Sequence, residues 1–153
     1  MPHTLPILHE PDPVLRKKAE PVELSQWDPT ELKTLAEDMV LTMKKAPGVG
    51  LAAPQIGQSI RLIVVERTPN PLILINPEIV KRSLRKQTLE EGCLSVPGAY
   101  GIIKRNKYVT VRALTLDGQP FELEAKGFLA QIFQHEIDHL NGTLYIDKAI
   151  TLL

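Results

Sequence analysis

Residues 135–139, near the carboxyl end of the chain, are His-Glu-Ile-Asp-His and form the pattern H-E-x-x-H. Residues four apart on a helix share one face, so the imidazoles of His135 and His139 can converge on one metal ion. Glu136 stands beside the first imidazole and can act as a general base without being a ligand. The pattern predicts metal chemistry; the alternative interpretation is two ordinary histidines beside a helical acid.

A catalytic site of this type usually has three protein ligands and one open position. The long metalloprotease pattern would need a third histidine at position 145, which is Tyr145. Residues 140–153 contain no glutamate, and Asp147 is their only acid and a weak candidate. The third ligand is therefore expected upstream, where the candidates are a carboxylate, Cys93, His3 and His9.

Cys93 is the only cysteine and lies in a non-helical segment, residues 90–98. A thiolate there would join two imidazoles in a tetrahedral site with one position left for water. A buried, small apolar side chain is the other interpretation of a lone cysteine. Spacing alone leaves both open.

Residues 48–57 contain three glycines and two alanines. They lack the patterns of nucleotide-binding loops, which excludes that class of site. Small side chains allow another backbone to approach closely, so the segment is interpreted either as one wall of a substrate groove, with Gln55 as a donor, or as a plain connection.

Two helices and a group of strands are expected to position these segments. Asp28 and Pro29 are typical of a helix start, and apolar residues then recur at helical spacing as far as Pro47. A second helix is expected over 127–140, ending at Asn141-Gly142. Runs typical of strands occupy 60–66, 72–75, 108–114 and 121–125. Helices at both ends with strands between them predict one α+β domain over residues 1–153.

Composition excludes several classes of protein. Hydrophobic residues make up 43% of the chain, which argues against disorder. Lys+Arg and Asp+Glu number 18 each, so no nucleic-acid partner is expected from net charge. A single cysteine cannot form an internal disulfide. No apolar run is long enough for a membrane span and no signal peptide is visible, so neither a membrane partner nor export is expected.

Together, three segments resemble the peptide deformylase family. Its motifs G-x-G-x-A-A-x-Q, E-G-C-x-S and H-E-x-x-H correspond to residues 48–55, 91–95 and 135–139, in the family's order and at its separations. Residues 11–16, Pro-Asp-Pro-Val-Leu-Arg, are a looser match. The resemblance covers essentially the whole chain. It implies an α+β fold with antiparallel or mixed sheets around the H-E-x-x-H helix, and an amino-terminal helix.

The resemblance also implies an activity: hydrolysis of the formyl group from the N-terminal formylmethionine of newly made polypeptides, with release of formate. By resemblance, the metal ligands are Cys93, His135 and His139, and the metal is Fe²⁺, for which Ni²⁺, Co²⁺ or Zn²⁺ can substitute. Glu136 would transfer the proton. The Gln55 side chain and the Leu94 N–H would stabilise the oxyanion.

Gly50 and neighbouring backbone are expected to pair with the substrate main chain as an added strand. We hypothesise that an apolar pocket holds the methionine side chain. Its lining would be Val49, Leu89, Phe128 and Ile132, with Gln131 as a polar edge. The complete set of expected substrate-binding residues is Gly48, Val49, Gly50, Leu89, Glu91, Gly92, Tyr100, Phe128, Gln131 and Ile132.

The chain departs from the best-known bacterial pattern in two places. Tyr100 occupies the position, seven residues after the cysteine, where an arginine is common; organelle and phage forms show similar variants. The chain also stops about 14 residues after His139, so docking on the ribosome through a carboxy-terminal helix is not expected. The expected location is the cytoplasm, or a host cytoplasm or organelle if the source is viral or the chain is trimmed. The sequence does not determine an oligomeric state.

Two competing functions remain for comparison. One is a short H-E-x-x-H zinc peptidase that uses His135, His139 and Asp147. The other is a non-catalytic module with a closed, structural metal site.

Overall fold

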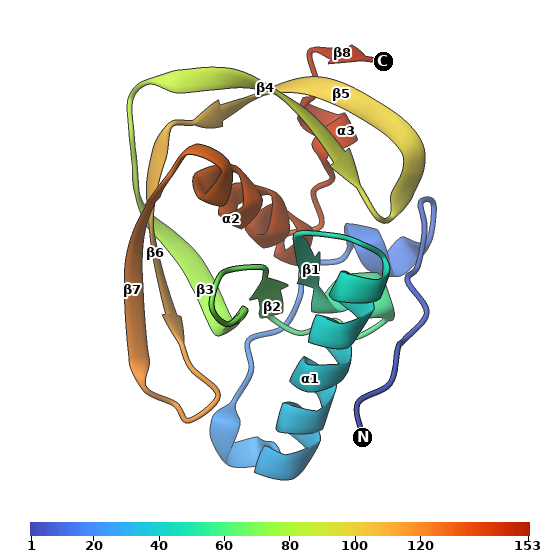
Figure 1. Cartoon of the computed structure of the whole chain (residues 1–153), viewed down its shortest axis with the longest axis vertical. Helices are drawn as coiled ribbons and strands as arrows, with labels where there is room; N and C mark the ends of the chain where they lie inside the picture. The colour runs from blue at the N-terminus through green and yellow to red at the C-terminus, as the bar shows by residue number, and fades with distance from the viewer.

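Two sheets surround the H-E-x-x-H helix in the computed structural model, which describes residues 1–153 (Figure 1). The larger sheet has the order β1-β2-β3-β6-β7 and all its pairs are antiparallel. The smaller antiparallel sheet has the order β4-β5-β8. The strands are β1 (Gly50–Ala52), β2 (Leu62–Val65), β3 (Leu72–Arg82), β4 (Lys86–Cys93), β5 (Val96–Asn106), β6 (Tyr108–Leu114), β7 (Pro120–Lys126) and β8 (Thr151–Leu152).

The helices begin where the sequence predicts. In α1 (Pro29–Lys45), the Asp28 side chain accepts a hydrogen bond from the Thr30 N–H at 2.9 Å, which satisfies one free donor of the first turn. The second long helix, α2 (Gly127–Leu140), carries the H-E-x-x-H residues, and Asn141 follows it as expected. The short helices are η1 (Pro13–Arg16), η2 (Leu24–Gln26), η3 (Ala53–Ile56) and α3 (Tyr145–Lys148). These elements confirm the α+β fold class.

Strand β2 is buried on both faces and separates two apolar clusters. Leu62 and Val64 belong to the cluster that contains the α1 methionines, whereas Ile63 and Val65 belong to the cluster that contains Phe133 of α2. The alternation of side chains along a strand therefore places α1 and α2 on opposite faces of the larger sheet. Each fully buried apolar side chain contributes roughly 1.5–3 kcal/mol, so α2 is held rigidly along its apolar face.

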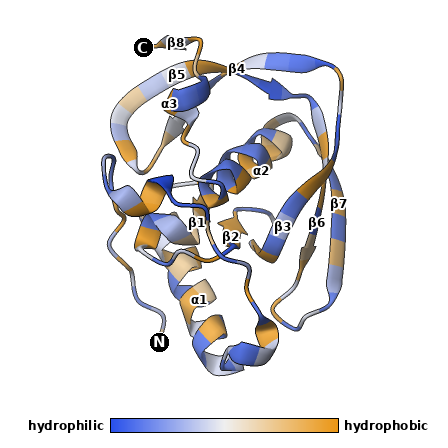
Figure 2. Cartoon of the chain, turned by 180° about the vertical axis from the view of Figure 1, so that it is seen from behind, coloured by the Kyte–Doolittle hydropathy of each residue, from blue (hydrophilic) through white to orange (hydrophobic).

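The β4–β5 hairpin was not predicted as strands from the sequence. Its two strands are long, with Lys86 opposite Asn106 and Gly92 opposite Tyr100. Figure 2 shows β4 as mostly hydrophilic. Because many of its residues are charged or polar on both faces, the alternation that normally indicates a strand is missing. This hairpin nevertheless brings Cys93 to α2.

No helix of the chain is both long enough and apolar enough to cross a membrane.

Candidate metal centre and cleft

Three candidate ligand atoms meet where the end of β4 faces α2. The Cys93 sulfur lies 3.3 Å from His139 Nε2, and His139 Nε2 lies 3.2 Å from His135 Nε2. All three ligand atoms fall within 4.8 Å of one another. Two metal–nitrogen bonds of about 2.1 Å at a tetrahedral angle separate the nitrogens by about 3.4 Å, so the observed spacing fits a common ion. The donor set, one sulfur and two imidazoles, suits zinc, iron, cobalt or nickel.

The charges around the two imidazoles also fit a cation. Burial lowers the pKa of His135, but Glu136, Cys93 and Glu91 outweigh it and raise that pKa well above its ordinary value. The surroundings of His135 therefore favour a positive charge at this point, whether a proton or a metal ion. Burial, together with His135, holds the pKa of His139 well below its ordinary value. His139 is thus neutral, which is the form that binds metals.

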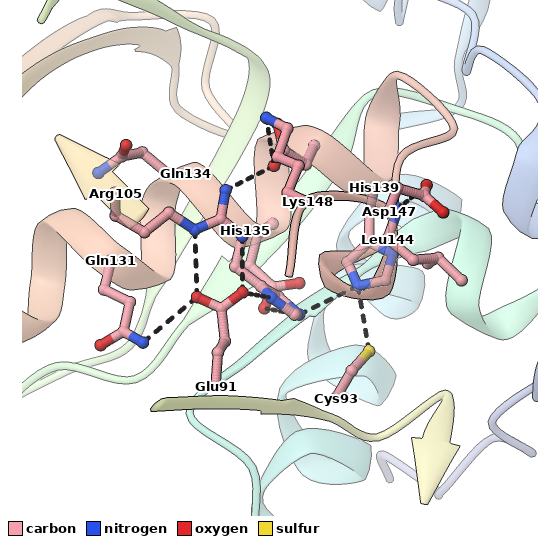
Figure 3. A network of polar contacts seen from close by, with 12 residues as sticks. Glu91, Cys93, Arg105, Gln131, Gln134, His135, His139, Leu144, Asp147 and Lys148 are labelled. Carbon is pink, nitrogen blue, oxygen red and sulfur yellow. Dashed lines mark hydrogen bonds and ion pairs between the residues drawn. The ribbon is translucent and has the colours of Figure 1, made fainter. Parts of the chain in front are cut away.

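Glu91 holds His135 in place (Figure 3). Its Oε2 atom lies 2.8 Å from His135 Nδ1, which leaves Nε2 of that ring facing the other ligands. Arg105 donates to both oxygens of Glu91, at 3.2 and 2.6 Å. Burial raises the pKa of Glu91, but the hydrogen bonds from His135 and Arg105 outweigh it and bring the pKa to about 2. Glu91 is therefore ionised and fixes the orientation of the imidazole.

The ion pairs extend outward from Glu91. Arg105 also pairs with Asp138 at 2.6 Å, and Lys148 lies 3.0 Å from the same Asp138 oxygen. Gln131 donates to Glu91 Oε1 at 3.2 Å and to the Glu90 carbonyl at 3.1 Å. These contacts join β4, β5, α2 and α3 around one buried arginine, so the position of the ligand-bearing helix depends on them.

Glu136 points into the cleft from the floor formed by α2. Its Oε2 atom lies 4.0 Å from His135 Nε2, and its Oε1 atom is buried and accepts no hydrogen bond. Burial raises the pKa of Glu136 from 4.5 to about 7. A side chain with a pKa near neutrality can both accept and release a proton, as general acid–base catalysis requires.

Gly50 provides the space that Glu136 occupies. A Cβ atom built at Gly50 would lie 2.6 Å from Glu136 Oε2, closer than such contacts occur. The glycine of the first motif is thus needed for the carboxylate of the third motif. It also lies on β1, the edge strand of the larger sheet, which pairs only with β2.

The other two residues expected to act on the substrate flank the Cys93 sulfur. Gln55 is buried; its Oε1 accepts from the Ala52 N–H at 2.9 Å, which orients its Nε2 toward Ser95 Oγ at 3.1 Å and Cys93 at 3.6 Å. Leu94 lies in the turn after β4, and its N–H donates to no group of the chain. Both residues line the cleft, with donors close to the candidate ligands.

The cleft has a volume of about 450 Å³ and is open to solvent. Most of the expected substrate-binding residues line it: Gly48, Val49, Gly50, Glu91, Gly92, Tyr100, Phe128, Gln131 and Ile132. Leu89 does not line the cleft, because it lies on β4 four positions before Cys93, about 13 Å along the strand from that ligand. Gln131 directs its amide at Glu91 rather than leaving it free.

The remaining candidate ligands lie elsewhere. His3 contacts Asp38 of α1, and His9 is exposed. Asp147 pairs with Arg16 and accepts from the Leu144 N–H. None of them belongs to the cluster, so the short zinc peptidase with Asp147 as third ligand is not favoured.

Three buried polar residues near the cluster were given no role from the sequence, although Ser95 is the last residue of the second motif. Arg105 and Ser95 are the first two, and the signal for Arg105 is an arginine on the inward face of a strand next to Ile103. The third is Tyr145, whose ring stacks at 6.3 Å from His135 and whose hydroxyl is buried without a partner.

Comparisons with known proteins agree with this arrangement. A family profile described as polypeptide deformylase matches residues 4–152. The peptide deformylase of Desulforudis audaxviator is 50% identical over 147 residues, covering 95% of this chain and 94% of that protein. The crystal structure of the Thermotoga maritima peptide deformylase is 44% identical, with a TM-score of 0.91 over 96% of this chain and 98% of that one. A Met-Ala-Ser-bound peptide deformylase from Acinetobacter baumannii is 39% identical, with a TM-score of 0.91 over 97% and 99% of the two chains.

Proposed function

The chain belongs to the polypeptide deformylase family, and we propose that Cys93, His135 and His139 hold its metal ion while Glu136, Gln55 and Leu94 act on the substrate. The observation that carries this proposal is the meeting of one sulfur and two imidazole nitrogens, all within 4.8 Å, beside an open cleft that Cys93 and His135 line.

The enzyme hydrolyses the amide bond between the formyl group and the N-terminal methionine of newly made polypeptides. Water is added across that bond, so the products are formate and a free amino terminus. When bound, the metal ion supplies a Lewis acid that favours ionisation of water and polarises the formyl oxygen.

Glu136 carries the proton. Its carboxylate accepts a proton from the attacking water and then gives it to the amine nitrogen as the carbon–nitrogen bond breaks. The pKa of about 7 suits both halves of this transfer. The Oε1 atom is buried and has no partner in the chain, so no hydrogen bond from the protein competes for this carboxylate oxygen.

Gln55 and Leu94 stabilise the charge that develops on the formyl oxygen. The Gln55 Nε2 group lies 3.6 Å from the Cys93 sulfur, and the free N–H of Leu94 belongs to the residue that follows Cys93; both groups are donors. Because Gln55 is buried and its oxygen is already bound by Ala52, the amide needs no reorientation during the reaction. Removal of one such preorganised donor commonly lowers kcat by about 10²–10³-fold.

The substrate main chain adds to the free edge of β1 at Gly50, where β1 lacks a second neighbour. The methionine side chain then enters the apolar part of the cleft, lined by Val49, Phe128 and Ile132. Tyr100 and Gly92 close the opposite side, since the Tyr100 ring packs over Gly92. The relative from Acinetobacter baumannii that binds Met-Ala-Ser, the product expected from a formylated tripeptide, supports this placement by analogy.

Fe²⁺ is the proposed metal. The family is metal-dependent, and a thiolate with two imidazoles accommodates ferrous iron. A thiolate that holds ferrous iron is sensitive to oxygen and peroxide. Enzyme loaded with iron under anaerobic conditions should therefore be more active than enzyme purified in air. Equal activity of the two preparations would contradict iron as the working metal.

Residues 1–153 are proposed to form one catalytic domain, because both apolar clusters share the larger sheet. A cytoplasmic or organellar location follows from the substrate, which occurs where formylated polypeptides are made.

Formate release from formyl-Met-Ala-Ser, with metal content measured in parallel, tests the proposal. The wild-type enzyme should release formate and leave internal peptide bonds intact, and Cys93→Ala should lose both metal and activity. A Cys93→Ala protein that keeps one equivalent of metal and full activity would overturn the ligand assignment. Cleavage of an internal peptide bond would overturn the reaction.

A further inference from the structure

Basic side chains gather at one corner of the molecule where the two sheets join. Six of them are exposed and Lys107 is partly exposed. We call this surface the basic corner; it comprises Lys81, Arg82, Arg85, Lys86, Lys104, Lys107 and Lys126. It lies at the ends of β3, β5 and β7 and at the start of β4.

Strand pairing brings these residues together from four segments. The β3–β4 turn lies against the β5–β6 turn, since the Ser83 N–H donates to the Tyr108 carbonyl at 2.9 Å and the Lys107 N–H donates to the Arg85 carbonyl at 3.1 Å. Tyr108 is in turn paired with Lys126 of β7. The cations therefore form one continuous surface.

The charge of the basic corner is not compensated. None of its seven cations forms an ion pair, whereas Arg112 on the same sheet pairs with Glu122. The sequence contains no acid between Ile79 and Leu89 or between Gly101 and Leu116. The nearest acid by strand register is Glu124, opposite Thr110. A chain with zero net charge thus has a local positive field.

Tyr108 adds an aromatic ring to this surface. Its side chain is 54% exposed beside Lys126 and the β3–β4 turn. Exposed aromatic rings among cations are typical of surfaces that bind single-stranded nucleic acids, because unstacked bases pack on the ring while phosphates contact the cations. Leu84 in the β3–β4 turn is exposed as well, whereas Phe128, two residues after Lys126, lines the cleft; one aliphatic side chain is too little apolar area for insertion into a lipid surface.

We propose that the basic corner binds single-stranded nucleic acid through its phosphates, with Tyr108 stacking on a base. The zero net charge of the whole chain gave no reason to expect a nucleic-acid partner. The clustering of seven cations on one surface does give a reason to expect it. None of the seven cations lines the cleft. Lys86 and Cys93 are seven residues apart on an extended strand, about 23 Å, so hydrolysis of a short peptide is independent of this surface.

Fluorescence anisotropy with a labelled 20-nucleotide oligouridylate and the metal-loaded full chain tests the proposal. The test variant is Lys86→Gln, Lys104→Gln and Lys107→Gln combined; the matched control is Lys17→Gln, Lys18→Gln and Lys44→Gln, three exposed lysines without ion pairs. With about three phosphate contacts, wild-type affinity should fall about 18-fold between 50 and 200 mM salt. The test variant should bind about tenfold more weakly at low salt, and the control within about twofold of wild type.

Tyr108→Ala should weaken binding by about tenfold, since stacking on a ring contributes about 1–3 kcal/mol per base. All variants should hydrolyse formyl-Met-Ala-Ser at the wild-type rate, which shows that they are folded. No binding by wild type at concentrations up to about 100 µM, or equal losses in test and control variants, would overturn the proposal. Tighter binding to vesicles of anionic lipid than to oligouridylate, at equal phosphate concentration, would overturn it in favour of a membrane surface.

Discussion

The carboxylate of Glu136 lies where a side chain at Gly50 would be: a Cβ atom there would stand 2.6 Å from Oε2. The residues are 86 positions apart in the sequence and belong to an edge strand and to the H-E-x-x-H helix. Gly50 thus has two consequences for the site. It leaves room for the proton-transferring group, and it keeps the edge of β1 open to a substrate backbone.

Gly50→Ala should therefore displace Glu136 and reduce kcat by about 10²-fold, because displacements of about 1 Å at a reacting group have effects of that size. Metal content should not change, since Gly50 does not contact the ligands. Steady-state kinetics and metal analysis measure both quantities. If Gly50→Ala lowers kcat by displacing Glu136, the double variant Gly50→Ala, Glu136→Gln should have the same kcat as Glu136→Gln alone. Fully additive losses would contradict this explanation.

Glu136→Gln should reduce kcat by 10²–10⁴-fold with metal content unchanged. It should also change the pH dependence of stability in the metal-free protein. Burial raises the pKa of Glu136 from 4.5 to about 7, so the folded protein binds this proton more tightly than the unfolded chain. The contribution of Glu136 to the free energy of unfolding is then greatest below pH 4.5 and declines by about 3 kcal/mol as the pH rises to about 7.

Urea unfolding of both metal-free proteins at pH 4.5 and above pH 7 measures this decline. The difference in stability between Glu136→Gln and wild type should increase with pH over that interval. A difference that is constant, or that decreases with pH, would show that Glu136 is not a buried acid with a raised pKa.

Glu91→Gln should weaken metal binding by 10–100-fold, because it removes the charge that holds His135 Nδ1 at 2.8 Å. Competition with a chelator measures the affinity. Glu90→Gln, at the exposed neighbouring position, is the matched control and should leave metal affinity unchanged. Equal affinities of Glu91→Gln and wild type would exclude the proposed positioning of the imidazole.

Arg105→Met should destabilise the protein by about 3–5 kcal/mol, since it leaves the carboxylates of Glu91 and Asp138 without their buried partner. Arg112→Met removes an exposed pair with Glu122 and should cost about 0–1 kcal/mol. Denaturant unfolding compares the two variants. Similar losses of unfolding free energy in the two variants would mean that the buried network contributes no more to stability than a surface ion pair.

Removal of the metal should lower the melting temperature. An ion present at about 1,000 times its dissociation constant stabilises the fold by about 4 kcal/mol, which corresponds to roughly 10 °C for a domain of this size. Calorimetry with and without a chelator measures the shift. The shift should disappear in Cys93→Ser if the sulfur is a ligand, whereas an unchanged shift in that variant would assign the ion to another site.

Local spacing was sufficient for the parts of the molecule that lie within one helix or one turn. The start of α1 at Asp28-Pro29 and the shared face of His135 and His139 follow from helical geometry, and the structure confirms both helices. Co-occurrence of three motifs identified the family before any contact between them was known. Helix propensity and hydrophobic periodicity depend on residues a few positions apart. The start of α1 and the shared face of the two histidines depend on nothing more distant.

Only the tertiary structure decided which distant residues meet. Spacing alone left Cys93, His3, His9 and a carboxylate open as candidates for the third ligand; folding brings Cys93 to 3.3 Å from His139, 46 positions away. The β4–β5 hairpin was missed because charged residues occupy both of its faces, and its buried charges find partners on α2 as well as on each other: Arg105 pairs with Asp138, and Glu91 with His135. Whether a buried charge finds a partner depends on the packing of separate segments, and a linear pattern of residues does not record that packing.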